Sequence, residues 1–346
     1  MRILIVGAGA IGSLVGAKLA LRRHAVALVA RPPAVEAIHR DGLRLIEDGA
    51  QLTVRDVEAV PSVRAAFADS PAFDLAIFAM KAYGVAESAT ELDQATPEPP
   101  PVLMLQNGVG SEECVTAILP LVPVIAGSIT TPAEMRAPGL VEVSRSRRGL
   151  GLAATRPEQS LDALARVLRG AGFQVRVYAD YRALKWSKLL LNLVGNATSA
   201  ILDLLPAEVF ADPRLFRVEL GAFREAVAVM RAMGVKPVGL PGYPLPGLAP
   251  VLLHVPQMVL QPLMGRIIAG GRGGKLPSLY ADLAQRRERS EVEFLNGAVV
   301  RHGREVGVAT PVNQVLADTL SGLVQGRFHW AEFRGRPERL LAELGW

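Results

Sequence analysis

The 346-residue sequence contains little cysteine and few aromatic residues. Its one cysteine, Cys114, excludes an internal disulfide and favours a reducing compartment such as the cytoplasm. We interpret it as a buried structural thiol rather than a nucleophile. Aromatic residues make up 5% of the chain, and no basic run is interleaved with them. The net charge of +5 therefore indicates a surface that favours small anions, and we expect no nucleic-acid partner.

No uninterrupted hydrophobic run is long enough to cross a membrane. The apolar stretch 251–269 is broken by His254, Pro256, Pro262 and Arg266, whereas a span needs about 20 mostly apolar, uncharged residues. The apolar start of the chain runs directly into a glycine motif, without a basic leader or a cleavage site. We therefore expect no secretory signal, no membrane partner and a cytoplasmic location.

Lysine is scarce relative to arginine. Only six of the 38 basic residues are lysines. If arginine is used at positions that need only a positive charge, each lysine becomes a candidate for proton chemistry that a guanidinium group cannot perform. The six are Lys18, Lys81, Lys185, Lys188, Lys236 and Lys275.

Half of the residues are hydrophobic, and the chain is long enough for two domains with sizeable cores. Near its start, apolar residues 2–6 predict a strand, residues 13–21 a helix and residues 26–29 a second buried strand. The glycine motif between the first strand and the helix has the G-x-G-x-x-G spacing of a dinucleotide-binding turn. The motif is Gly7, Ala8, Gly9, Ala10, Ile11 and Gly12.

Each part of this glycine motif has a physical task. Gly7 permits the tight turn, Gly9 lets a pyrophosphate approach the backbone, and Gly12 lets helix and strand pack closely. The helix N-terminus then offers N–H groups to the phosphates. An enzyme that binds NAD places an acid at the end of the second strand, but Ala30 and Arg31 stand there. This favours NADP(H), unless Arg31 is an ordinary surface arginine.

Polar residues follow two further predicted strands, 73–79 and 102–105. Lys81 comes after the first and Asn107 after the second, at strand ends where doubly wound sheets carry functional groups. For Asn107 with its following glycine, a plain turn is the competing interpretation.

The rest of the first half predicts more strands and helices, and near residue 179 the pattern becomes almost entirely helical, with a proline- and glycine-rich interruption at 236–247. We therefore predict domains 1–179 and 180–346. The further strands are expected at 43–54 (a hairpin), 122–128, 130–135, 140–143, 149–152 and 174–177, and the helices at 32–40 and 160–170.

The stretch 181–205 predicts a helix with an apolar face and a polar row. Lys188, Asn192 and Asn196 follow one another at intervals of four, so a continuous helix would place them on one face. Such a row suits either an active site or a polar stripe in water. Glu291 is expected near the start of a later helix, where a capping role is the alternative to a catalytic one. The stretch 270–275 lacks the spacing of a phosphate loop.

Together these motifs resemble the ketopantoate reductase (2-dehydropantoate 2-reductase) family. They are GAGAIG, Arg31, the lysine of MKAY, the asparagine of LQNG, WSKLLLNLVGN and RSEVEFLNGAVV. The resemblance implies an N-terminal Rossmann domain, a helical C-terminal domain and an active site in the cleft between them. Arg286 stands where glycine is usual, and the stretch 241–275 is long for the family.

The resemblance also implies roles for the residues. Lys188 corresponds to the general acid and Glu291 to its acidic partner. Asn192 and Asn196 correspond to amides that contact the substrate. Lys81 and Asn107 correspond to residues that contact cofactor and substrate, and Ser278 to a serine that receives the substrate carboxylate.

The predicted fold class is α/β, a Rossmann-type doubly wound sheet followed by an all-α domain. The predicted function is NADPH-dependent reduction of a 2-keto acid, foremost 2-dehydropantoate to pantoate in pantothenate biosynthesis. The alternatives are a related NADP-dependent reductase or dehydrogenase for a different 2-keto acid, and a non-catalytic NADP(H)-binding redox regulator. We expect no metal, and exposed apolar surface on the helical half would suit a homodimer.

Overall fold

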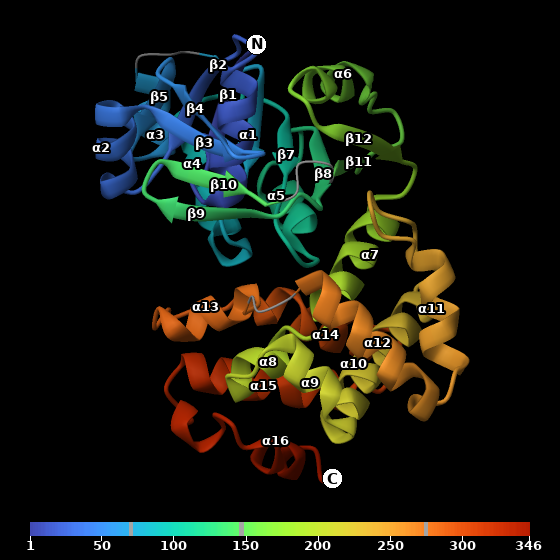
Figure 1. The fold of residues 1–346 in the computed structure, drawn as a ribbon. Helices are drawn as coiled ribbons and strands as arrows, with labels where there is room; N and C mark the ends of the chain where they lie inside the picture. Colours follow the sequence, from blue (N-terminus) through green and yellow to red (C-terminus); the bar gives the residue numbers. More distant parts are fainter. Residues whose placement is uncertain (69–71, 145–148, 273–275) are drawn as a thin grey trace. The chain divides into compact units, whose positions relative to one another are not determined.

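The computed structural model describes residues 1–68, 72–144, 149–272 and 276–346. All of its strands lie between residues 2 and 178, and the later part of the described chain is built from helices (Figure 1). The predicted fold class, an α/β N-terminal part followed by a helical part, is therefore confirmed.

The main sheet has eight strands in the order β12-β11-β8-β7-β6-β1-β2-β5. Neighbouring strands are parallel except β8 and β11, which are antiparallel. The order runs outward in both directions from β1, so the switch point at which ligands bind in doubly wound sheets lies between β1 and β6. The strands are β1 (Arg2–Val6), β2 (Ala25–Val29), β5 (Val57–Val60), β6 (Leu75–Phe78), β7 (Val102–Met104), β8 (Val124–Ile129), β11 (Gly149–Ala154) and β12 (Gln174–Tyr178).

Strand β1 is apolar on both sides because both faces of the sheet are covered. Ile3 and Ile5 belong to one core cluster, and Leu4 and Val6 to another. The first cluster includes residues of α1 and α6, and the second includes residues of α3, α4 and α5. This two-sided burial explains the continuous apolar runs. The helices of this part are α1 (Ala10–Ala20), α2 (Pro32–Asp41), α3 (Val63–Ala68), η1 (Ala82–Gly84), α4 (Val85–Ala95), α5 (Ser111–Ile118) and α6 (Asp162–Gly170).

A smaller sheet with the order β4-β3-β10-β9 packs against α1. Its strands are β3 (Leu43–Glu47), β4 (Ala50–Val54), β9 (Ala133–Ala137) and β10 (Leu140–Val143). The predicted hairpin at 43–54 is confirmed by the antiparallel pairing of β3 with β4. Strand β5 and helix α3 were not expected, because each is too short to show a clear hydrophobic period.

The helical part begins with α7, and here one prediction is wrong. The stretch 181–205 is not one helix, because α7 ends at Leu193 and α8 begins at Ala197. Gly195 has a φ of 61°, and its N–H donates to the Glu219 carboxylate. The helices are α7 (Tyr181–Leu193), α8 (Ala197–Leu202), α9 (Pro206–Ala211), α10 (Pro213–Ala232), α11 (Leu245–His254), α12 (Gln257–Arg272), α13 (Ser278–Ala284), η2 (Glu291–Phe294), α14 (Asn296–Glu305), α15 (Pro311–Val324), η3 (Trp330–Glu332) and α16 (Pro337–Glu343).

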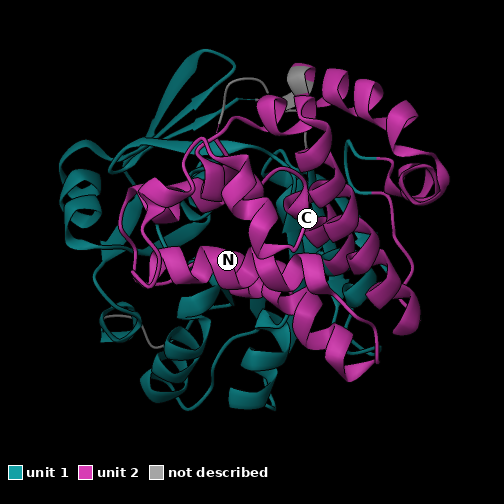
Figure 2. Cartoon of the chain, turned by 90° about the horizontal axis from the view of Figure 1, so that it is seen from below, with its two compact units in different colours: residues 1–106, 110–185, 240–243 teal, residues 107–109, 186–239, 244–346 magenta. Residues whose placement is uncertain are grey.

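The chain forms two compact units (Figure 2). Unit 1 comprises residues 1–106, 110–185 and 240–243, and unit 2 comprises 107–109, 186–239 and 244–346. The division falls within α7, and the predicted boundary between residues 179 and 180 stays a prediction. None of the helices in the described ranges is both long and apolar enough to cross a membrane.

Candidate active site

The turn between β1 and α1 in unit 1 is built around its three glycines. Gly7 has a φ of 108°, and a Cβ there would lie 2.6 Å from the Met80 nitrogen. A Cβ on Gly12 would lie 1.9 Å from the Gly7 oxygen. At Gly9, by contrast, no heavy atom lies within 4 Å of the Cβ position. Gly7 and Gly12 therefore permit close packing, whereas Gly9 leaves open space beside the backbone, as a dinucleotide requires.

Helix α1 offers backbone donors next to this open space. Its first hydrogen bond runs from Ser13 N to Gly9 O at 2.8 Å, so the N–H groups of Ala10, Ile11 and Gly12 precede the helical ladder. The first turn contains no acidic residue that would repel an anion. The turn thus fits a pyrophosphate, with Ala8 in the loop before it.

The other cofactor candidates of unit 1 follow the two strands that flank β1. Arg31 comes after β2 as the exposed N-cap of α2, next to buried Ala30. Lys81 comes after β6, is half-buried, and directly follows the Met80 backbone that approaches Gly7. Because β2 and β6 both run parallel to β1, the glycine turn, Arg31 and Lys81 share the carboxyl edge of the sheet.

In unit 2 a chain of hydrogen bonds joins three predicted substrate residues. Asn192 Nδ2 donates to Asn107 Oδ1 at 3.0 Å, and Asn196 Nδ2 donates to Asn192 O at 3.0 Å. Asn196 Oδ1 in turn accepts from Leu279 N at 3.2 Å. Leu279 directly follows Ser278, the exposed first residue of α13, so the chain of hydrogen bonds ends one residue after Ser278 along the sequence.

Glu291 belongs to the same unit and is 4% exposed. It begins the short helix η2, and its N–H lies 3.4 Å from Asp282 Oδ2 of α13. At the other end of η2, Phe294 O accepts from Val109 N at 3.1 Å. Helix η2 thus connects α13, which begins with Ser278, to the loop that carries Asn107.

Lys188 lies on α7 one turn before Asn192 and is half-buried. The two share a helix face, as their spacing predicts. The predicted row of three is wrong at Asn196, which lies beyond the break at Gly195 and occupies the N-cap position of α8. Both ends of the Asn196 amide are already hydrogen-bonded within the protein, so this residue braces α7 and α13.

Sequence reasoning missed a buried ion pair in unit 1. Lys185 Nζ lies 2.9 Å from Glu112 Oε1, and the two residues are 2% and 1% exposed. Burial raises the pKa of the Glu112 carboxyl, and the Lys185 ammonium opposes that rise. The scarcity of lysine marks Lys185 as unusual, but nothing in the sequence points to its partner 73 residues away.

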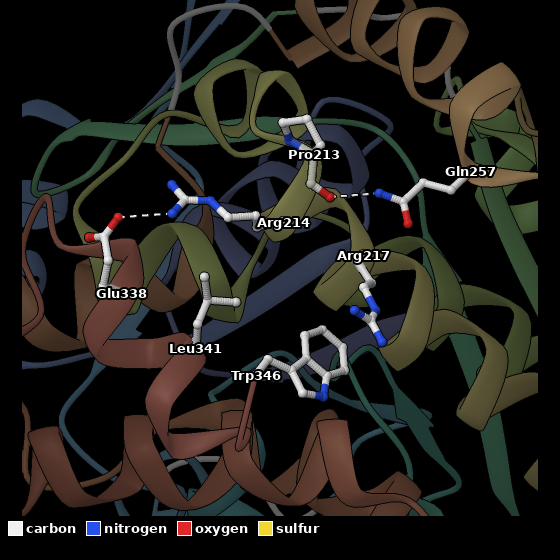
Figure 3. Close-up of a pocket in the computed structure, with 7 residues that line it drawn as sticks. All are labelled: Pro213, Arg214, Arg217, Gln257, Glu338, Leu341 and Trp346. Carbon is white, nitrogen blue, oxygen red and sulfur yellow. Dashed lines mark hydrogen bonds and ion pairs between the residues drawn. The ribbon is translucent and has the colours of Figure 1, made fainter.

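A pocket of about 520 Å³ lies at the start of α10 in unit 2 (Figure 3). Arg214 Nη1 donates to Glu338 across it at 3.0 Å, and the Arg217 guanidinium carbon lies 4.4 Å from the centre of the Trp346 ring. None of the predicted site residues lines this pocket, so we give it no part in the chemistry.

Two of the sequence-based predictions concern a metal ion and a phosphate loop. Within the described ranges, no three His, Cys, Asp or Glu side chains gather as a metal site would require. The stretch 270–275 begins in α12, which runs to Arg272, and residues 273–275 lie outside the described residues.

Comparison with known proteins identifies the family. Residues 3–150 match the family model described as ketopantoate reductase PanE/ApbA, and residues 180–324 match the model of its C-terminal part. The chain is 30% identical over 333 residues to a 2-dehydropantoate 2-reductase from Archaeoglobus fulgidus, covering 94% of this chain and 98% of that protein. This chain belongs to the ketopantoate reductase family.

Other members of the ketopantoate reductase family extend the similarity. A 2-dehydropantoate 2-reductase from Halobacterium salinarum is 30% identical over 322 residues, covering 92% of this chain and 97% of that protein. The crystal structure of a PanE/ApbA family ketopantoate reductase from Ralstonia eutropha is 30% identical with a TM-score of 0.79, covering 95% of this chain and all of that one.

D-Mandelate dehydrogenase with NADH and anilino(oxo)acetate shares the fold at 22% identity and a TM-score of 0.79, covering 94% of this chain and 99% of that one.

Proposed function

We propose that this protein reduces 2-dehydropantoate to pantoate with NADPH, as a step of pantothenate biosynthesis. The observation that carries the proposal is the hydrogen-bonded set in unit 2, in which Asn192 joins Asn107 at 3.0 Å one helical turn after Lys188. Similarity to 2-dehydropantoate 2-reductases along nearly the whole chain supports it.

In this proposal the glycine turn, Arg31 and Lys81 hold the cofactor. The open space at Gly9 and the N–H groups of α1 suit the pyrophosphate. Arg31, with no acid beside it, suits a 2′-phosphate. A bound dihydronicotinamide supplies the hydride that converts the substrate's C2 carbonyl to an alcohol.

The residues of unit 2 stabilise the charge that develops on the substrate's carbonyl oxygen and supply the proton of the product's hydroxyl group. When C2 accepts a hydride, negative charge grows on its oxygen. The Lys188 ammonium stabilises this charge and donates the proton that completes the hydroxyl group. Asn192 and Asn107 orient the polar groups of the substrate, and Ser278 receives its carboxylate. After the transfer the Lys188 amine regains a proton from water, and the negative charge of Glu291 favours its return to the ammonium form.

The first test is turnover by the wild-type protein, followed by the loss of NADPH absorbance with 2-dehydropantoate, pyruvate or 2-ketoisovalerate. We expect the highest kcat/KM with 2-dehydropantoate. Tight binding of NADPH without its consumption on any keto acid would instead identify a redox regulator.

The second test removes the proposed acid. Lys188→Ala should lower kcat by about 10²- to 10⁴-fold, because one proton donor and one charge are lost, while the Kd for NADPH stays close to the wild-type value. Lys236→Ala is the matched control, because Lys236 is exposed and lies outside the set in unit 2. Unchanged turnover in Lys188→Ala would refute the assignment.

The fold of D-mandelate dehydrogenase favours a second candidate, a dehydrogenase for another 2-hydroxy acid. Benzoylformate, the keto acid related to mandelate, should therefore join the substrate panel together with NADH. A preference for this pair would replace 2-dehydropantoate and NADPH in the proposal.

A homodimer also forms part of the proposal. Helix α12 exposes large apolar side chains on unit 2, with Met258 87%, Val259 60% and Ile267 53% exposed. Burying these side chains against a second copy would stabilise association. Light scattering should give twice the chain mass for the wild type and the mass of one chain for Met258→Asp/Ile267→Asp.

A further inference from the structure

The buried pair of Lys185 and Glu112 is poorly explained by stability alone. Each charge loses its hydration water on folding, and the attraction between the two only partly offsets the free energy that this desolvation costs. Apolar side chains of similar volume would fill the same space at no greater cost. Lys185 is 2% exposed and Glu112 is 1% exposed. An ion pair so deeply buried therefore suggests a function beyond stabilising the fold.

Besides Glu112, Lys185 has a second partner, which indicates this function. Its Nζ donates to the backbone oxygen of Gln106 at 2.6 Å. The Gln106 side chain is also fixed, since its Nε2 lies 3.3 Å from Met80 O and 3.2 Å from Met80 Sδ. The carbonyl that Lys185 holds belongs to the peptide bond that leads into Asn107, so its orientation sets the direction in which Asn107 leaves the end of β7.

The positions of these side chains along α7 strengthen the argument. Lys185, Lys188 and Asn192 follow at intervals of three and four, which places them on one helix face. Lys185 binds the carbonyl before Asn107, and Asn192 binds the Asn107 side chain at 3.0 Å. Lys188 lies on α7 between these two attachments.

We infer that Lys185, fixed by Glu112, is a positioning residue that holds the Gln106–Asn107 peptide against α7 and thereby aligns Asn107 with Lys188 for the reduction. Its catalytic consequence depends on the proposed function. Glu112 neutralises the buried ammonium and limits its movement, so that Lys185 has one donor geometry toward the carbonyl. Neither residue needs to contact substrate or cofactor.

The test separates positioning from stability with a paired replacement. Lys185→Met leaves Glu112 buried without its partner and should lower the thermal midpoint by several degrees. Lys185→Met/Glu112→Leu removes both charges and should restore most of that midpoint, but it still lacks the donor to Gln106 O. Its kcat should therefore remain about 10- to 100-fold below the wild type, as expected when reacting groups are misplaced, with the Kd for NADPH within about twofold.

A second ion pair in unit 1 provides the matched control. Lys18 Nζ lies 2.7 Å from Glu47 Oε1, with side chains 11% and 19% exposed, and it has no part in the segment around Asn107. Lys18→Met/Glu47→Leu should keep the wild-type kcat. If the Lys185→Met/Glu112→Leu variant also combines a wild-type kcat with a restored midpoint, the pair is merely structural and the inference fails. Loss of its cooperative unfolding transition would overturn the inference as well.

Hydrogen exchange gives a readout that does not depend on turnover. The amides of residues 107–109 should exchange faster in Lys185→Met/Glu112→Leu than in the wild type, while those of α1 should not change. If the wild type reduces no keto acid, the proposed function fails and exchange alone decides the positioning role. Unchanged exchange at 107–109 would then reject it.

Discussion

At the scale of single residues, the two units carry different kinds of side chain. Unit 1 presents backbone donors and the guanidinium of Arg31, which suit phosphate groups. Unit 2 presents amides and the ammonium of Lys188, which suit a carbonyl group whose oxygen gains charge. The division matches the needs of a bound dinucleotide and a small keto acid.

Arg31 allows the cofactor preference to be tested. Arg31→Asp should raise the Kd for NADPH by about 10- to 100-fold, because a charge-assisted hydrogen bond to the 2′-phosphate is replaced by repulsion. The Kd for NADH should fall or stay the same. Titration of cofactor fluorescence measures both, with the exposed Arg22→Asp as control. An unchanged ratio of the two constants would show that Arg31 does not select the cofactor.

At the scale of elements, the glycines of the β1–α1 turn have two different functions, since Gly9 leaves space for a ligand and Gly12 permits close packing. Gly9→Val adds a side chain where no atom lies within 4 Å, so the thermal midpoint should hardly change while the Kd for NADPH rises at least about tenfold. Gly12→Ala brings a Cβ within 1.9 Å of the Gly7 oxygen and should cost about 1–3 kcal/mol of stability. Equal stability of the two variants would contradict this account.

The end of α13 offers a stabilising substitution. Arg286 has a φ of 49°, in the left-handed region, and the Arg287 N–H donates to Asp282 O at 2.9 Å as in a helix end that usually contains glycine. Arg286→Gly should therefore raise the free energy of unfolding by about 0.5–1 kcal/mol. Arg286→Ala is the control, because it keeps the Cβ that causes the strain. Urea unfolding compares the two, and an equal gain in both would exclude backbone strain as the cause.

Local patterns predicted the elements that depend on local forces. The glycine turn, β1 and the 43–54 hairpin follow from periodicity and turn chemistry within a few residues. The break between α7 and α8 does not, because Gly195 adopts its positive φ where Glu219 of another helix accepts its N–H. The Lys185–Glu112 pair was hidden for the same reason. What the sequence could not reveal are contacts between residues far apart along the chain.

At the scale of the whole molecule, the cofactor should stabilise the fold by mass action. NADPH at about 100 times its Kd should raise the free energy of unfolding by about 2.7 kcal/mol. Calorimetry with and without NADPH measures the change, and Gly9→Val provides a control in which the same concentration has a smaller effect. If the thermal unfolding transition of the wild type does not shift when NADPH is added, the assignment of the glycine turn to the cofactor is wrong.

The chain also crosses between its units more than once. Residues 240–243 follow α10 of unit 2 yet belong to unit 1. Thr130 Oγ1 lies 3.0 Å from Pro241 O, and a Cβ on Gly149 would lie 2.8 Å from the Pro241 Cβ. A gene fragment that ends before α7 would therefore produce unit 1 without residues 240–243. The surface beside β8 and β11 that Pro241 contacts would then be exposed to water. When the two parts are expressed separately, the fragment of unit 1 should be unstable unless residues 240–243 are added to it.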